Sequence, residues 1–211
     1  MPRNKYPEIT IEKILAAAQK LFLEKGYDET TIQDIVNELG GMTKGAIYHH
    51  FKSKDDIFVA LSEKMFSANN PFAIVKNRKD LNGLQKIREA IRLSNSNEVH
   101  AELARQGIPI LKNPRMLAVA IEGSRTQISP LLTELLEEGN RDGSINTKYP
   151  SELAEVFQLL TDIWLTPSIF PATAEEMYRK ILFLKEMLDN MGVPLFDEAI
   201  LNAAKHAFEK I

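Results

Sequence analysis

The residues between Leu39 and Lys54 carry the clearest chemical pattern in this chain of 211 residues. No acidic residue occurs in this stretch, and its polar side chains are hydroxyl, phenol, imidazole and ammonium groups. They belong to Thr43, Lys44, Tyr48, His49, His50, Lys52, Ser53 and Lys54. Ammonium and hydroxyl groups donate hydrogen bonds to phosphate oxygens. Charge alone does not separate a phosphate-binding surface from a solvated loop, so the helical pattern around these residues has to decide.

The overall composition gives no global support for a polyanionic partner, because the formal net charge is −3. Residues 1–56 hold 8 Lys and Arg against 9 Asp and Glu. The 44% hydrophobic and 26% charged residues are typical of a globular protein. The chain has no cysteine, which excludes disulfides and thiolate metal sites. Without a secretory signal or an apolar run of ~18 residues, we expect a cytoplasmic protein that makes no membrane contact.

Apolar residues at helical spacing predict the first two helices. The stripe over residues 11–22 predicts a helix that begins at Thr10 as N-cap and is closed by Gly26. The second helix begins at Thr31, and Asp34 three residues later completes a variant of the capping box. Both helices place an apolar face toward a common core.

A tight turn at Gly40–Gly41 separates the second helix from a short third one. Thr43 is the expected N-cap of that helix, which is about nine residues long. Ile47 and Phe51 lie one turn apart and face inward. A fourth helix begins at Ser53 and ends before residue 71.

The rest of the chain also reads as helical, and no alternation typical of β-strands is found. Further helices are predicted near residues 80–94, 98–111, 114–140, 151–165, 174–191 and 197–210. Pro130 should kink or break the long middle one. The prediction is an all-α chain with one domain over residues 1–56 and a second over 57–211.

Two short helices joined by a glycine-containing turn form a helix-turn-helix arrangement. The major groove of B-DNA is about 12 Å wide and admits one helix, whose N-terminal residues face the base edges. Gly45 in the first turn of the third helix permits a close approach of its backbone.

Two runs resemble the DNA-binding region of the TetR/AcrR family of bacterial transcriptional regulators. They are Thr30-Thr31-Ile32-Gln33-Asp34-Ile35 and Thr43-Lys44-Gly45-Ala46-Ile47-Tyr48-His49-His50-Phe51-Lys52-Ser53-Lys54-Asp55-Asp56-Ile57. The likeness covers about residues 10–61. It implies an N-terminal three-helix helix-turn-helix DNA-binding domain followed by an all-helical ligand-binding and dimerisation domain.

The resemblance also implies DNA contacts residue by residue. The residues nearest the base edges would be Thr43, Lys44, Gly45 and Ala46. Those at phosphates would be Thr31, Tyr48, His49 and Lys54, with His49 or Tyr48 also near a thymine methyl. The chain departs from the family at Gly40-Gly41-Met42, where the usual turn is one residue shorter. A left-handed glycine can absorb the extra residue, or the reading helix is rotated in the groove.

Two apolar stripes in the second domain can serve the core, a dimer interface, or both. They comprise Leu153, Val156, Phe157, Leu160, Ile163 and Trp164, and Met177, Ile181, Leu184 and Leu188. The resemblance implies that the last long helices of two subunits form a four-helix bundle. A dimer would also fix the spacing of two reading helices on a near-palindromic DNA site.

Candidate effector-binding residues form a weaker pattern. An apolar stretch over residues 117–121 becomes polar ahead of Pro130, which suits either a small-molecule pocket or an ordinary amphipathic helix. Its polar residues are Glu122, Ser124, Arg125, Thr126 and Gln127, and isolated candidates elsewhere are His100, Arg105 and Trp164. No metal-binding, cofactor-binding or catalytic motif is found, so we expect neither an enzyme nor a bound cofactor.

Together these features predict a homodimeric DNA-binding regulator, in the first place a repressor released by a small molecule. The alternative is a helical small-molecule-binding or interaction protein whose helix-turn-helix no longer binds DNA. A helical-bundle enzyme is a third class, but the sequence offers no catalytic constellation for it.

Overall fold

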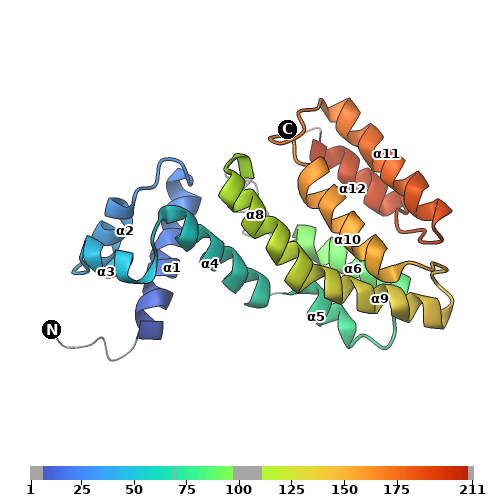
Figure 1. The fold of residues 1–211 in the computed structure, drawn as a ribbon, viewed down its shortest axis with the longest axis horizontal. Helices are drawn as coiled ribbons and strands as arrows, with labels where there is room; N and C mark the ends of the chain where they lie inside the picture. Colours follow the sequence, from blue (N-terminus) through green and yellow to red (C-terminus); the bar gives the residue numbers. More distant parts are fainter. Residues whose placement is uncertain (1–6, 69, 97–110, 209–211) are drawn as a thin grey trace. The chain divides into compact units, whose positions relative to one another are not determined.

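The computed structural model describes residues 7–68, 70–96 and 111–208, and every regular element in these ranges is a helix (Figure 1). The described residues form two compact units. The first holds residues up to Asn70, and the second holds 71–96 and 111–208. The first unit therefore includes the whole fourth helix, whereas the sequence prediction ended the first domain at residue 56.

Four helices make up the described part of the first unit (Figure 1). They are α1 (Pro7–Lys25), α2 (Ile32–Leu39), α3 (Lys44–His50) and α4 (Lys54–Ala68). Helix α1 packs against α2 and α4, and α2 packs against α3. The core they share includes the fully buried side chains of Ile14, Phe22, Ile35, Ile47 and Ile57.

The ends of these helices follow the predicted local signals, with one exception. Gly26 has a positive φ of 90° where α1 ends. Ser53 Oγ accepts a hydrogen bond from the main-chain N of Asp56 at 3.1 Å where α4 begins. Helix α1, however, already begins at Pro7, so the prediction that Thr10 caps it is wrong. Proline favours the first helical position because its φ is preset and its missing N–H has no helical acceptor there.

The second unit contains the remaining helices. They are α5 (Pro71–Lys76), α6 (Gly83–Ser96), α8 (Pro114–Gly123), η2 (Ser124–Ile128), α9 (Ser129–Asp142), α10 (Pro150–Leu159), η3 (Leu160–Trp164), α11 (Ala174–Asn190) and α12 (Glu198–Phe208). Helix α9 packs against α5, α6 and α10, and α11 packs against α12. The sequence pattern does not predict α5, because Pro71 indicates only the end of the preceding helix. The helix predicted over 98–111 lies almost entirely outside the described residues.

Two π-helical turns interrupt this unit. The distortion expected at Pro130 is the first of them, η2, which joins α8 directly to α9. The main-chain N of Ser129 donates to the carbonyl of Ser124, five residues earlier, so the helix widens here instead of breaking. The second turn, η3, continues α10 and ends at Trp164.

Helices α6 and α9 approach each other at the level of their main chains. A Cβ added to Gly83 would lie 2.2 Å from the main-chain N of Gly139. The main-chain N of Gly83 also donates to the Asp142 carboxylate at 2.6 Å, which satisfies a free N–H at the start of α6. No side chain larger than hydrogen fits at Gly83 without separating the two helices.

Candidate nucleic-acid interface

One side of α3 is buried in the first unit. Ile47 is fully buried, and Phe51, which follows the helix, is nearly so. The hydroxyl of Thr43 caps the other end by accepting a hydrogen bond from the main-chain N of Ala46 at 3.2 Å. The main-chain N of Phe51 donates to the carbonyl of Ile47 at 2.9 Å. These contacts fix the rotation of α3 about its own axis.

The opposite side of α3 is open to solvent and carries most of the predicted DNA contacts. Thr43, Lys44, Gly45, Tyr48 and His49 are exposed, and Ala46 is half-buried. Tyr48 keeps 47% of its surface exposed, which is high for an aromatic side chain. A Cβ added to Gly45 would meet only the Thr43 hydroxyl, at 3.9 Å. The structure thus gathers these residues on one helix and leaves the backbone at Gly45 uncovered.

The turn before α3 contains two consecutive residues with positive φ. Gly40 has φ 48° and Gly41 has φ 108°. Residues with a side chain rarely adopt such angles, so both glycines are needed for this path. The turn that holds the extra residue relative to the family pattern is therefore built on two positive-φ glycines.

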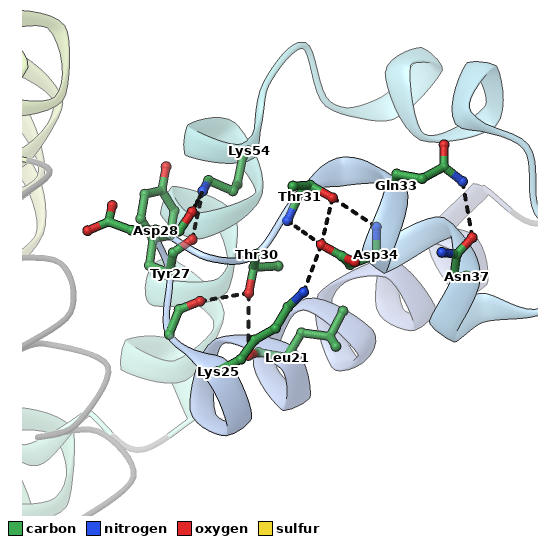
Figure 2. A network of polar contacts seen from close by, with 11 residues as sticks. Leu21, Lys25, Tyr27, Asp28, Thr30, Thr31, Gln33, Asp34, Asn37 and Lys54 are labelled. Atoms are coloured by element: carbon green, nitrogen blue, oxygen red, sulfur yellow. Dashed lines mark hydrogen bonds and ion pairs between the residues drawn. The ribbon is translucent and has the colours of Figure 1, made fainter.

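Thr31 is held in a complete capping box at the start of α2 (Figure 2). Its hydroxyl donates to the Asp34 carboxylate at 2.6 Å and accepts from the main-chain N of Asp34 at 3.2 Å. Its own main-chain N donates to the same carboxylate at 2.8 Å. Lys25 pairs with Asp34 at 2.8 Å. The hydrogen bond from Lys25, followed by those from Thr31, holds the pKa of the Asp34 carboxyl below its usual range.

Lys54 joins the start of α4 to the end of α1 (Figure 2). Its ammonium donates to the main-chain oxygens of Tyr27 at 2.6 Å and of Asp28 at 3.2 Å. It also lies 4.1 Å from the centre of the Tyr27 ring. Partial burial lowers the pKa of the Lys54 ammonium. Of the three N–H donors on an ammonium, two are engaged within the protein and one is left for an external acceptor.

Sequence reasoning missed the partners on the α1 side of this contact. Tyr27 is buried, and its hydroxyl donates to the Asp55 carboxylate of α4. Thr30 is fully buried, and its hydroxyl donates to the carbonyl of Gly26 at 2.7 Å. An aromatic residue and a threonine in a short loop after a helix-ending glycine were the available signals. Neither reveals the long-range partner.

The profile of bacterial regulatory proteins of the tetR family matches residues 14–61. This range runs from α1 into α4 and includes the capping box, the glycine turn and all of α3. Residues 14–61 are a regulatory domain of the TetR family.

Two relatives of the chain are named as transcriptional repressors. HTH-type transcriptional repressor Rv1474c of Mycobacterium tuberculosis is 36% identical over 74 residues, which cover 35% of this chain and 37% of the relative. HTH-type transcriptional repressor BepR of Brucella suis is 27% identical over 161 residues, which cover 69% of this chain and 73% of the relative. The chain thus spans little more than a third of the first relative's length.

Solved structures support the fold over most of the length of the chain. A TetR-family transcriptional regulator from Pectobacterium atrosepticum has a TM-score of 0.62 at 20% identity, covering 90% of this chain and 98% of that one. Salmonella enterica GusR has a TM-score of 0.61 at 21% identity, with the same coverage. At this identity the likeness establishes the fold alone.

The candidate effector residues of the second unit divide into exposed and buried groups. Glu122 and Arg125 form an exposed ion pair at 2.7 Å, one turn apart. Ser124 is buried and bonded to Asp162, which the sequence analysis did not consider. Trp164 packs against Phe183, with ring centres 5.6 Å apart. His100 and Arg105 lie outside the described residues.

The described part of the chain contains no group of three or more His, Asp or Glu residues able to hold a metal ion. Within the same ranges, no helix is long and apolar enough to cross a membrane. The core of the second unit contains a small apolar void of about 10 Å³, room for about one water molecule.

Proposed function

We propose that this TetR-family chain is a homodimeric transcriptional repressor that binds a near-palindromic DNA operator and is released by a small-molecule effector. The observation that carries the proposal is the two-sided character of α3. One side is fixed in the core by Ile47, and the other exposes hydroxyl, ammonium and phenol groups beside an uncovered glycine. The role is binding rather than catalysis, and the site of action is the bacterial cytoplasm, where the DNA is.

In this proposal α3 enters the major groove of DNA. Thr43, Lys44, Gly45 and Ala46 lie at its N-terminal end, which faces base edges in helix-turn-helix proteins. Tyr48 and His49 follow at the next turn and contact the phosphate backbone. Thr31, at the start of α2, and Lys54, at the start of α4, would position the protein on phosphates. Contacts to phosphates fix the register of the protein on DNA but do not distinguish one base sequence from another.

A homodimer is supported by exposed apolar side chains on the last helices of the second unit. Phe183 keeps 55% of its surface exposed, and Leu182 beside it is also exposed. Val156 and Leu159 on α10 are exposed in the same way. Apolar groups of this size on neighbouring turns indicate a protein interface. A C2 dimer would then present two α3 helices to two successive major grooves, about 34–36 Å apart or somewhat more.

Release by an effector requires that the effector bind two shapes of the dimer with different affinity. A coupling of about 1–3 kcal/mol is typical, which changes operator affinity about 5- to 150-fold. The effector would bind in the second unit and favour the shape whose α3 spacing no longer fits the operator.

Selection of binding sites from a random duplex pool tests the proposal with the whole chain. We expect recovery of a near-palindromic consensus, and binding to it that weakens steeply as salt increases. A Lys44→Ala, Tyr48→Phe double variant is the matched control and should recover that consensus poorly. A pool that shows no enrichment with the wild-type chain would instead indicate a helical ligand-binding or interaction protein.

A further inference from the structure

A buried polar contact joins the two π-helical turns of the second unit. The hydroxyl of Ser124 in η2 donates to the carboxylate of Asp162 in η3 at 2.6 Å. Ser124 is buried, and Asp162 is partly buried. The hydroxyl of Thr161 lies within 3.5 Å of the second carboxylate oxygen. π-Helical turns are rare in proteins and occur frequently at functional sites, so their meeting around a carboxylate is notable.

The carboxylate of Asp162 has no cationic partner within the described residues. The guanidinium of Arg125, adjacent to Ser124 in sequence, is bound by Glu122 at 2.7 Å. The ammonium of Lys180 donates to the carbonyl of Trp164 at 2.9 Å. Burial raises the pKa of the Asp162 carboxyl, and the hydrogen bonds from Ser124 and Thr161 only partly oppose that rise. Pairing a desolvated carboxylate of this kind with a cation compensates its buried negative charge and is strongly favourable.

A second polar side chain on the same helix, that of Gln158, is buried without a hydrogen-bond partner in the described residues. Gln158 is only 7% exposed, and its side-chain amide makes no hydrogen bond within the described part of the chain. Its main-chain oxygen, in contrast, accepts from the Thr161 hydroxyl at 3.2 Å. A buried amide with unused donors and an unused acceptor costs about 1–3 kcal/mol.

Gln158 and Asp162 lie four residues apart and therefore share one face of the helix formed by α10 and η3. Helix α10 packs against η2, the turn that carries Ser124. Ser124 and Asp162 thus bring a hydroxyl and a carboxylate together between η2 and η3, and Gln158 adds a buried amide one turn before Asp162. A purely structural Ser124–Asp162 contact would explain neither the unpaired charge of Asp162 nor the unused amide of Gln158.

We propose that Gln158, Asp162 and Ser124 bind the head group of the effector, and that this head group is a protonated amine. The ammonium would pair with the Asp162 carboxylate and donate a further hydrogen bond to the Gln158 amide oxygen. The rest of the effector is apolar, because Phe157 and Trp164 flank the site in sequence and pack against the hydrophobic core. The inference rests on the proposed function, since it names the chemical class of the effector.

Matched pairs of small molecules test this inference on the whole chain without DNA. The probes are 2-phenylethylamine, tryptamine and 1-naphthylmethylamine, each compared with the alcohol of the same carbon skeleton. Ligand-observed NMR and calorimetry give their affinities. We expect at least one amine to bind about tenfold or more tightly than its alcohol.

Variants of the site then locate the binding. Asp162→Asn removes the charge at nearly unchanged shape and should weaken the amine about tenfold or more, and Gln158→Leu should weaken it as well. Glu152→Gln, which neutralises an exposed carboxylate on α10, is the matched control and should leave amine affinity unchanged. Far-UV circular dichroism and thermal unfolding report whether each variant is folded, and Gln158→Leu provides the test if Asp162→Asn is not.

Three outcomes would overturn the inference: no amine binds, the alcohols bind equally well, or binding is the same in folded Asp162→Asn or Gln158→Leu. The duplex selection is independent of all three. A palindromic consensus together with any of these outcomes would leave the regulator in place and remove the amine site. Amine binding without a consensus would leave the amine site in place and remove the proposed DNA-binding function.

Discussion

The ammonium of Lys54 donates to the carbonyl of Tyr27 at 2.6 Å, although the two residues are 27 positions apart in the sequence. The residue proposed to contact phosphate is therefore also part of the packing between α1 and α4. Its placement depends on Tyr27, whose hydroxyl is bonded to Asp55 in the following position of α4.

Replacing Lys54 by methionine should therefore lower stability as well as DNA affinity. We expect the free energy of unfolding in urea to fall by about 1 kcal/mol, less than for a buried charged hydrogen bond because Lys54 is partly exposed. Lys52→Met is the matched control, since Lys52 is exposed and its main-chain N, which the substitution keeps, makes the hydrogen bond to Asp56. Equal stability of the two variants would contradict the anchoring role.

Thr31→Ala should destabilise the start of α2, because it removes both hydroxyl hydrogen bonds of the capping box. A loss of about 1 kcal/mol in the free energy of unfolding is typical of an N-cap substitution. Thr31→Ser keeps the hydroxyl and should retain most of the stability. If the serine variant were as unstable as the alanine variant, the methyl group rather than the cap would be responsible.

The same capping box should make stability depend on pH in acid. The folded state lowers the pKa of Asp34, so it favours the carboxylate more than the unfolded chain does. The contribution of Asp34 is therefore complete above its unfolded value near 3.8 and is lost as the pH falls below it. Urea unfolding between pH 2 and pH 6 should show a weaker acid dependence for Asp34→Asn than for the wild type. Parallel pH curves would contradict the assignment.

Residues at phosphates and residues at base edges should give different defects. Tyr48→Phe removes one hydroxyl and should weaken binding to all duplexes by a similar factor, about 3- to 10-fold. Lys44→Gln should change which bases are preferred, with discrimination shifting by about 1–3 kcal/mol at one position of each half-site. Affinities measured across a set of single-base operator variants distinguish the two patterns. A sequence-selective defect in Tyr48→Phe would refute its assignment to phosphate.

A charge introduced at Phe183 should prevent dimer formation if the exposed faces of α10 and α11 form the interface. Phe183→Glu is expected to sediment as a monomer at micromolar concentration and to bind the operator at least tenfold more weakly. Ile74→Glu on α5 is the matched control, because Ile74 is 52% exposed, similar to Phe183. A Phe183→Glu protein that remains dimeric would place the interface elsewhere.

Local signals in the sequence predicted much of the first unit. Thr31, Thr43 and Ser53 are caps as expected, since an N-cap acts on main-chain groups only two or three residues away. The buried positions of Ile47 and Phe51 follow from helical spacing alone. The predicted start of α1 was wrong, because Pro7 and Thr10 both favour a helix start and the helix begins at Pro7.

Contacts between distant residues were beyond the reach of the same reasoning. Nothing in the local pattern pairs Lys54 with Tyr27, or Ser124 with Asp162 38 residues away. The two π-helical turns were not predicted either, because an apolar pattern over one or two turns does not distinguish α-helical from π-helical hydrogen bonding. For the candidate DNA contacts, the sequence predicted which residues α3 exposes, whereas the involvement of Lys54 in packing required the structure.

The contact between Gly83 and Gly139 limits which parts of the second unit can respond to an effector. Two helices whose backbones touch cannot slide or rotate past each other without colliding, so α6 and α9 move as one rigid body. Any displacement that starts at Asp162 would then pass through α8, α10 or α11. A bulky residue at Gly83 would push α6 and α9 apart, and we expect such a variant to lose its response to effectors before its helices unfold.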